Sequence, residues 1–154
     1  TSPLINLAAI GHLDLLRALY ETVHIPTAVY WEVTRFEDQP GAESVQSLEW
    51  ITSRTCPRPD LATVLREDLD AGEAEAIAMA VDLDALLLID ERKGRRRASR
   101  LDVSRLGLLG VLVKAKREGH LPAVRPLLRA LREEAGFWIS EALYQRILES
   151  VDER

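Results

Sequence analysis

The chain has 154 residues, of which 47% are hydrophobic and 29% charged, as in an ordinary globular protein with one full core. Its formal net charge of −5 argues against a protein that coats nucleic acid nonspecifically, but allows a local basic groove on an acidic body. The single cysteine, Cys56, excludes an internal disulfide framework and a Cys-based zinc site. No apolar run approaches the ~18 residues that span a bilayer, and we expect one cytoplasmic domain over residues 1–154.

Helical patterns and short β-rich segments alternate in the first part of the chain. Each helix is indicated by apolar spacing and by Gly or Pro at its ends. The expected helices cover residues 3–10, 13–20, 27–36 and 42–48, with a short one from Asp60. The expected strands cover residues 22–25 and 50–55.

The stretch from residue 69 to 97 organises the chain. Asp70 can cap a helix, and Glu73 stands where the reciprocal acid of a capping box is found. A helical projection places Glu73 at the edge of the buried face and Glu75 on the far side, toward water. The buried face is predicted to contain Ala74, Ile77, Ala78 and Val81.

An apolar run at residues 85–89 follows and ends in Asp90. Such a run is typical of a strand buried on both faces of a parallel sheet. Further along, strands are expected at 102–104 and 137–139, and helices at 107–117, 122–134 and 140–151. The alternation predicts an α/β fold with a mainly parallel sheet flanked by helices.

Three acids stand at the ends of predicted elements: Glu32, Glu73 and Asp90. Carboxylates that converge repel one another unless a cation bridges them, and sites rich in oxygen suit Mg²⁺ or Mn²⁺. Such sites hydrolyse phosphodiesters with activated water. Each acid also has a structural interpretation: Glu73 in a capping box, Glu32 on a helix surface, and Asp90 as cap of the next helix.

Seven basic residues follow the acidic strand end within a short span. They suit a phosphate backbone lying beside the acids, although a solvated helix face has the same composition. They are Arg92, Lys93, Arg95, Arg96, Arg97, Arg100 and Arg105.

Five blocks in order resemble the PIN-domain family, in particular its prokaryotic branch related to the toxin ribonucleases of toxin–antitoxin pairs. The blocks are TSPLINLAAIGHLDLL, IPTAVYWEV, DAGEAEAIAMA, LLLIDERKGRRRA and GLLGVLVKAKREGHL, and they span residues 1 to about 150. The resemblance implies a three-layer fold and a cluster of acids at the carboxyl edge of a parallel sheet that binds Mg²⁺ or Mn²⁺. By position, the family's acids match Glu32, Glu73 (with Glu75 as the alternative) and Asp90, which are the expected catalytic and metal-binding residues.

The family pattern also begins with an apolar strand that ends in Asp just before the TSPL-like segment. The printed sequence starts at Thr1 and so lacks this central strand and its acid. We expect that the sequence is shortened here, because an α/β sheet without its middle strand would leave apolar neighbours and backbone groups unpaired.

The first hypothesis is a metal-dependent endoribonuclease of the PIN type, the toxin of a toxin–antitoxin pair, with RNA held by Arg92, Lys93, Arg95, Arg96 and Arg97. A second is a catalytically weak or inactive PIN-fold module that binds RNA or protein. A third is a nuclease directed at DNA, since nothing in the sequence reads a 2′-hydroxyl. The resemblance further implies a small antitoxin partner and a homodimer.

Overall fold

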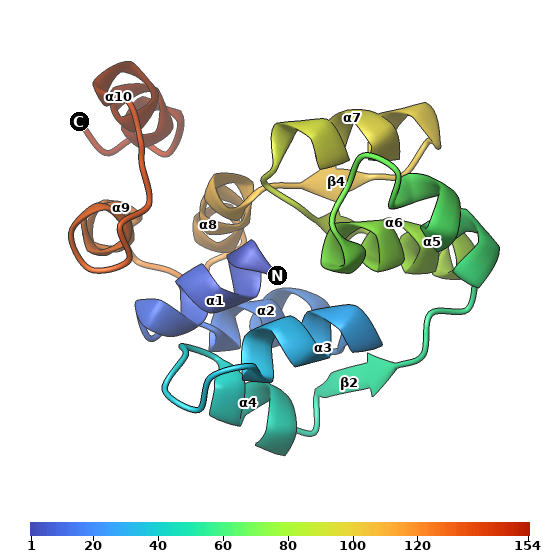
Figure 1. Ribbon diagram of the computed structural model, residues 1–154. Coiled ribbons are helices and arrows are strands. Elements are labelled where there is room, and N and C mark those ends of the chain that lie inside the picture. The colour runs from blue at the N-terminus through green and yellow to red at the C-terminus, as the bar shows by residue number, and fades with distance from the viewer.

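The computed structural model describes residues 1–154 and contains ten helices and four short strands (Figure 1). Both strand pairings are parallel, which confirms the predicted α/β fold with short parallel sheets flanked by helices. The helices are α1 (Ser2–Ala9), α2 (Asp14–Tyr20), α3 (Thr27–Thr34), α4 (Ala42–Ser47), α5 (Pro59–Leu65), α6 (Ala71–Leu83), α7 (Arg92–Arg100), α8 (Leu108–Arg117), α9 (Arg125–Glu133) and α10 (Glu141–Ser150). The strands are β1 (Val23–Pro26), β2 (Ile51–Arg54), β3 (Leu87–Leu88) and β4 (Arg105–Leu106).

The strands form two separate two-stranded sheets. β1 pairs with β2, with Val23 opposite Ile51, and β3 pairs with β4, with Leu87 opposite Arg105. An apolar groove of about 290 Å³ lies between the two sheets, lined by β1, by Leu86 to Leu88 and by one face of α6. Thr1 also lines this groove.

Three strand predictions need correction. β3 is much shorter than the predicted 85–89 segment, because only two of its residues pair with a neighbour, and Leu86 is 39% exposed. β4 lies after the predicted 102–104 segment, because Asp102 adopts a left-handed conformation (φ 56°) that turns the chain there. Residues 137–139 are not a strand: the Phe137 N–H donates to the Leu131 carbonyl and ends α9 in a turn.

Figure 1 shows α5, α6 and α7 grouped near β4, with α8 between this group and the C-terminal helices α9 and α10. Buried hydrophobic residues form two clusters. The larger cluster includes Val29 and Val33 of α3 as well as α8, and the smaller one includes Ile77 of α6 and Ile89 after β3. Glu32 therefore extends from the element of one cluster, whereas Glu73 and Asp90 extend from elements of the other.

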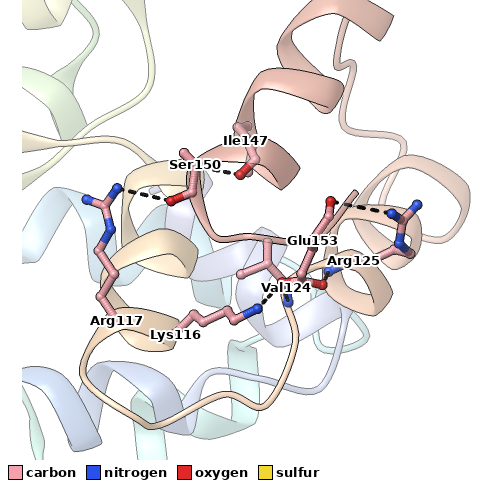
Figure 2. A network of polar contacts seen from close by, with 7 residues as sticks. All are labelled: Lys116, Arg117, Val124, Arg125, Ile147, Ser150 and Glu153. Atoms are coloured by element: carbon pink, nitrogen blue, oxygen red, sulfur yellow. Dashed lines mark hydrogen bonds and ion pairs between the residues drawn. The ribbon is translucent and has the colours of Figure 1, made fainter.

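The C-terminal tail is fixed to the body by Glu153, whose side chain is only 13% exposed. Its carboxylate accepts hydrogen bonds from Lys116 Nζ at 2.8 Å and from the N–H groups of Val124 at 2.6 Å and Arg125 at 3.1 Å (Figure 2). Although burial acts in the opposite direction, these bonds lower the pKa of Glu153 on balance. One carboxylate thus joins the end of α10, the last turn of α8 and the start of α9.

Candidate active site

Asp90 follows β3 and uses its two carboxylate oxygens differently. Oδ1 accepts a hydrogen bond of 2.8 Å from the Leu108 N–H in the first turn of α8, whereas Oδ2 is buried with no hydrogen-bond partner. Burial raises the pKa of Asp90, an effect that the Leu108 N–H and the charge of Arg95 partly offset. Asp90 does not cap α7, because Glu91 takes that role by accepting from the Gly94 N–H at 2.7 Å. An unpartnered buried oxygen of this kind is costly unless another group binds it.

Gly107 allows this approach of Asp90 to α8. A Cβ atom at residue 107 would stand 2.8 Å from Asp90 Oδ1 and 3.3 Å from Arg95 Nη1. Arg95 is held in place by a 2.9 Å bond from Nη1 to the Ile89 carbonyl. The position of Asp90 is thus set by a glycine, a helix N-terminus and one guanidinium.

Glu73 lies in the first turn of α6, which Asp70 caps by accepting from the Glu73 N–H at 2.9 Å. The Glu73 carboxylate makes no reciprocal capping bond in the structure, so only half of the predicted capping box forms. Burial, together with repulsion from Asp70 and Glu91, raises the pKa of Glu73 to about 7. No Lys or Arg side chain forms an ion pair with Glu73.

Glu32 of α3 is held against the start of α6. Its Oε1 accepts from the Gly72 N–H at 3.1 Å, and its Oε2 accepts from the Thr1 hydroxyl. The two helices come close because residue 72 is glycine: a Cβ there would stand 2.5 Å from Glu32 Oε1. The helix N-terminus favours the negative charge of Glu32 at this place.

The acids converge on one region of the molecule. The backbone nitrogen of Thr1 is buried and lies within the electrostatic reach of four carboxylates, and Glu32 in turn acts on Glu73. The four carboxylates belong to Glu32, Asp70, Glu73 and Asp90. Their side chains do not, however, form a ready set of three or more metal ligands around a single point.

The residues nevertheless fit a divalent cation chemically. The unbonded Oδ2 of Asp90 and the raised pKa of Glu73 mark oxygens that a positive charge would stabilise. Oxygen donors of this type are those that Mg²⁺ and Mn²⁺ prefer. Asp90 and Glu73 are therefore the two acids of this region that a positive charge would stabilise most.

Glu75 does not lie toward water as predicted. It is half-buried, and its Oε1 accepts a 3.2 Å hydrogen bond from the Ala28 N–H in the first turn of α3. The helical projection treats α6 as isolated, whereas α3 packs against it and covers this face. Glu75 therefore caps a neighbouring helix, which leaves Glu73 as the acid of α6 that faces the cluster.

The basic residues of α7 have different environments. Arg92, Lys93 and Arg96 are exposed, Arg95 is half-buried beside Asp90, and Arg97 forms an ion pair with Asp68. The predicted positive surface therefore exists beside the acids, but Arg97 already has an acidic partner within the protein.

Two residues that shape the acidic region, Asp70 and Gly72, are not recognised from the sequence as part of it. Asp70 is expected only to cap α6, yet its charge also acts on Glu73. Gly72 carries no signal in a single sequence, because its importance comes from the approach of α3 in the folded chain. An acid at the capping position and a glycine inside the first helical turn are the only local hints.

The comparisons with known proteins give one match. A family model described as a PIN domain matches residues 1–153. No curated protein and no solved structure matches the chain. None of the helices combines the length and the hydropathy required to cross a bilayer.

Proposed function

The chain belongs to the PIN-domain family, whose members are generally nucleases, and on this basis we propose that it is a metal-dependent endoribonuclease. The observation that supports the proposal is that Glu32, Glu73 and Asp90, from three separate elements, all lie within electrostatic reach of the Thr1 backbone nitrogen. Like charges brought together at a structural cost are typical of a functional site. The unbonded oxygen of Asp90 supports the same interpretation.

In this proposal Asp90 and Glu73 hold a Mg²⁺ or Mn²⁺ ion, and Glu32 completes the acidic surface around it. A bound ion of this kind lowers the pKa of water and neutralises charge on a phosphate. The Gly72 N–H and the Thr1 hydroxyl hold Glu32 in place, and the Leu108 N–H holds Asp90. These contacts orient the carboxylates before any ligand arrives.

The chain's own contribution to binding RNA comes from α7. Its exposed basic side chains lie next to Asp90 and attract the phosphate backbone, and no protein nucleophile is required. The RNA-binding residues in this proposal are Arg92, Lys93, Arg95, Arg96 and Arg97.

The test is cleavage of a single-stranded RNA by the purified protein with Mn²⁺, with Mg²⁺ and with EDTA. We expect cleavage with either metal and none in EDTA, because the carboxylates alone supply no activated water. A DNA oligonucleotide of the same sequence tests the DNA-directed alternative, which cleavage of DNA in preference to RNA would support. Absence of cleavage of either strand with both metals would contradict the proposal.

A second candidate function is a PIN-fold module that binds RNA or protein and cuts poorly. It is favoured by one observation, the absence of three side chains already placed to hold a metal ion. Calorimetric titration with Mn²⁺ separates the two functions. Binding with a stoichiometry near one that is lost in Asp90→Asn supports the nuclease, whereas no metal binding together with intact RNA binding supports the module.

We also propose that the protein is the toxin of a toxin–antitoxin pair and that it forms a homodimer. The exposed basic residues of α7 beside Asp90 are the surface that a small antitoxin protein would need to cover. Trp31 and Phe36, which are 64% and 56% exposed, offer apolar surface for a second copy. Growth arrest on expression tests the first proposal, and light scattering of the wild type against Trp31→Ser tests the second.

A further inference from the structure

A polar hollow lies beside the acid cluster, and Asp90 forms part of its wall. It is open to solvent, and no hydrophobic residue lines it. One face of α7 contributes four side chains at helical spacing, and β4 contributes one. The lining residues are Asp90, Arg92, Arg95, Arg96, Ser99 and Arg105.

The hollow carries a clear excess of positive charge. Four arginines line it, and Asp90 is the only acid in its wall. None of the four arginines forms an ion pair, in contrast to Arg97, which pairs with Asp68 on another side of the helix. Arg95 is fixed by its bond to the Ile89 carbonyl, and Arg105 Nη1 donates to the Val103 carbonyl at 3.4 Å. The side chains of Arg92 and Arg96 form no ion pair within the protein. This excess of positive charge favours an anion as the ligand of the hollow.

The donor set matches a phosphate group in particular. Guanidinium forks bind phosphate oxygens in pairs, and the exposed hydroxyl of Ser99 adds a further donor. Because the hollow is open at the surface, a strand can pass through it. Asp90 belongs both to this wall and to the acid cluster. A phosphate held in the hollow would therefore lie next to the phosphate that is cleaved at the acid cluster.

We propose that this hollow is a subsite for a backbone phosphate of the RNA strand, next to the phosphate that is cleaved, and that Arg96 and Arg105 are its main ligands. The inference rests on the proposed function and deepens it, since it selects Arg105 and Ser99 and sets aside Arg97 and Lys93. Arg100 provides a matched control, because it is an exposed arginine of the same helix that does not line the hollow.

The experiment measures binding of a 3′-fluorescein-labelled single-stranded RNA 12-mer by anisotropy in EDTA, where no cleavage occurs, over a range of KCl concentrations. Arg96→Ala and Arg105→Ala should each weaken binding about 5–10-fold and reduce the slope of log affinity against log salt by ~0.7, the value for one phosphate contact to a single strand. Arg100→Ala should lose no more than about twofold and keep the wild-type slope. Melting temperatures of all variants show whether the fold is retained.

Two further outcomes separate the possibilities. If the wild type cleaves RNA but Arg96→Ala and Arg105→Ala bind like Arg100→Ala, the subsite is wrong and the proposed function stands. If the wild type neither binds nor cleaves RNA, the proposed function itself fails. Equal affinity for 5′-phosphorylated and 5′-hydroxyl RNA supports a backbone phosphate, whereas a preference for the 5′-phosphate that disappears in Arg96→Ala would overturn it in favour of recognition of the strand end.

Discussion

Asp90 and Leu108 are joined by a hydrogen bond of 2.8 Å that ties the end of β3 to the first turn of α8. The bond occupies one carboxylate oxygen and leaves the other, Oδ2, buried without a partner. The same contact therefore fixes the acid in place and keeps a donor oxygen available. Because one oxygen of Asp90 fixes the side chain and the other stays available as a donor, the proposed activity depends most directly on Asp90.

Asp90→Asn should reduce metal-dependent RNA cleavage at least ~10²-fold, because a principal charge-stabilising group is lost. The Asn side-chain oxygen can still accept from the Leu108 N–H, so the melting temperature should stay close to that of the wild type. Initial rates with Mn²⁺ and thermal melts check both statements. Full activity in a folded Asp90→Asn protein would refute the assignment.

Glu73 and Glu75 make a matched pair on α6. Glu73→Gln should abolish metal-dependent cleavage, whereas Glu75→Gln should leave the rate within about threefold and cost ~0.3–1 kcal/mol of stability through the weakened cap on α3. Chemical denaturation and cleavage rates of the two variants give the comparison. The opposite pattern, with Glu75→Gln inactive, would favour the alternative acid and contradict the placement of Glu73.

Much of the fold is predictable from local chemistry. Asp70 caps α6 and Ser140 caps α10, as their spacing from the following apolar residues indicates. The short strands are harder to place, because two-residue pairings depend on the neighbour more than on the segment itself. The turn at Asp102, which delays β4, depends on a left-handed conformation that an aspartate adopts without an obvious signal.

The sequence identifies the acids of the candidate site but not their arrangement in space. Periodicity favours Glu73 over Glu75 by placing Glu75 toward water, which is wrong because α3 covers Glu75 in the fold. The basic composition of α7 is visible at once in the sequence. Only the fold shows which arginines form no ion pair and that Arg105 of β4 lies beside them.

Gly72→Ala should displace Glu32, since the new Cβ would stand 2.5 Å from its Oε1. We expect a loss of ~10–100-fold in metal-dependent activity, the range seen when residues that orient a ligand are removed. A double-mutant cycle provides the control. If the glycine acts through Glu32, the variant with both Gly72→Ala and Glu32→Ala should be no less active than Glu32→Ala alone, and additive losses would contradict this mechanism.

The raised pKa of Glu73, about 7, predicts a pH dependence of both metal binding and stability. Protons compete with the cation, so Mn²⁺ affinity should rise between pH 6 and 8 and level off above. In EDTA a carboxyl group whose pKa is raised on folding stabilises the folded state below its ordinary value of 4.5, and this contribution is lost as the pH rises through about 7.

Wild type and Glu73→Gln should therefore melt at similar temperatures near pH 5 in EDTA. At pH 8 the wild type should melt lower than Glu73→Gln, because only the wild type then carries the buried negative charge. Saturating Mn²⁺ at pH 8 should reverse the order by binding the wild type alone. A constant difference between the two proteins from pH 5 to 8 would rule out titration of Glu73 as its source.

The lowered pKa of Glu153 predicts that stability depends on pH in the opposite direction to the effect of Glu73. Its pKa is lowered on folding, so its contribution to stability is present above about pH 4.5 and is lost as the pH falls through the folded value. Glu153→Gln should cost about 1–3 kcal/mol at pH 7, because hydrogen bonds to a charged acceptor are replaced by weaker neutral ones. Glu149→Gln is the matched control, since this exposed acid of α10 has no hydrogen-bond partner for its side chain.

Denaturant melts at pH 7 and near pH 3.5 give the measurement for Glu153. The destabilisation by Glu153→Gln should shrink at the lower pH, because the wild-type carboxylate then begins to lose its charge as well. RNA cleavage at pH 7 should be unchanged in the folded protein, because Glu153 contacts the last turn of α8, whereas Asp90 contacts its first turn. Equal destabilisation at both pH values would show that Glu153 acts through packing and not through its charge.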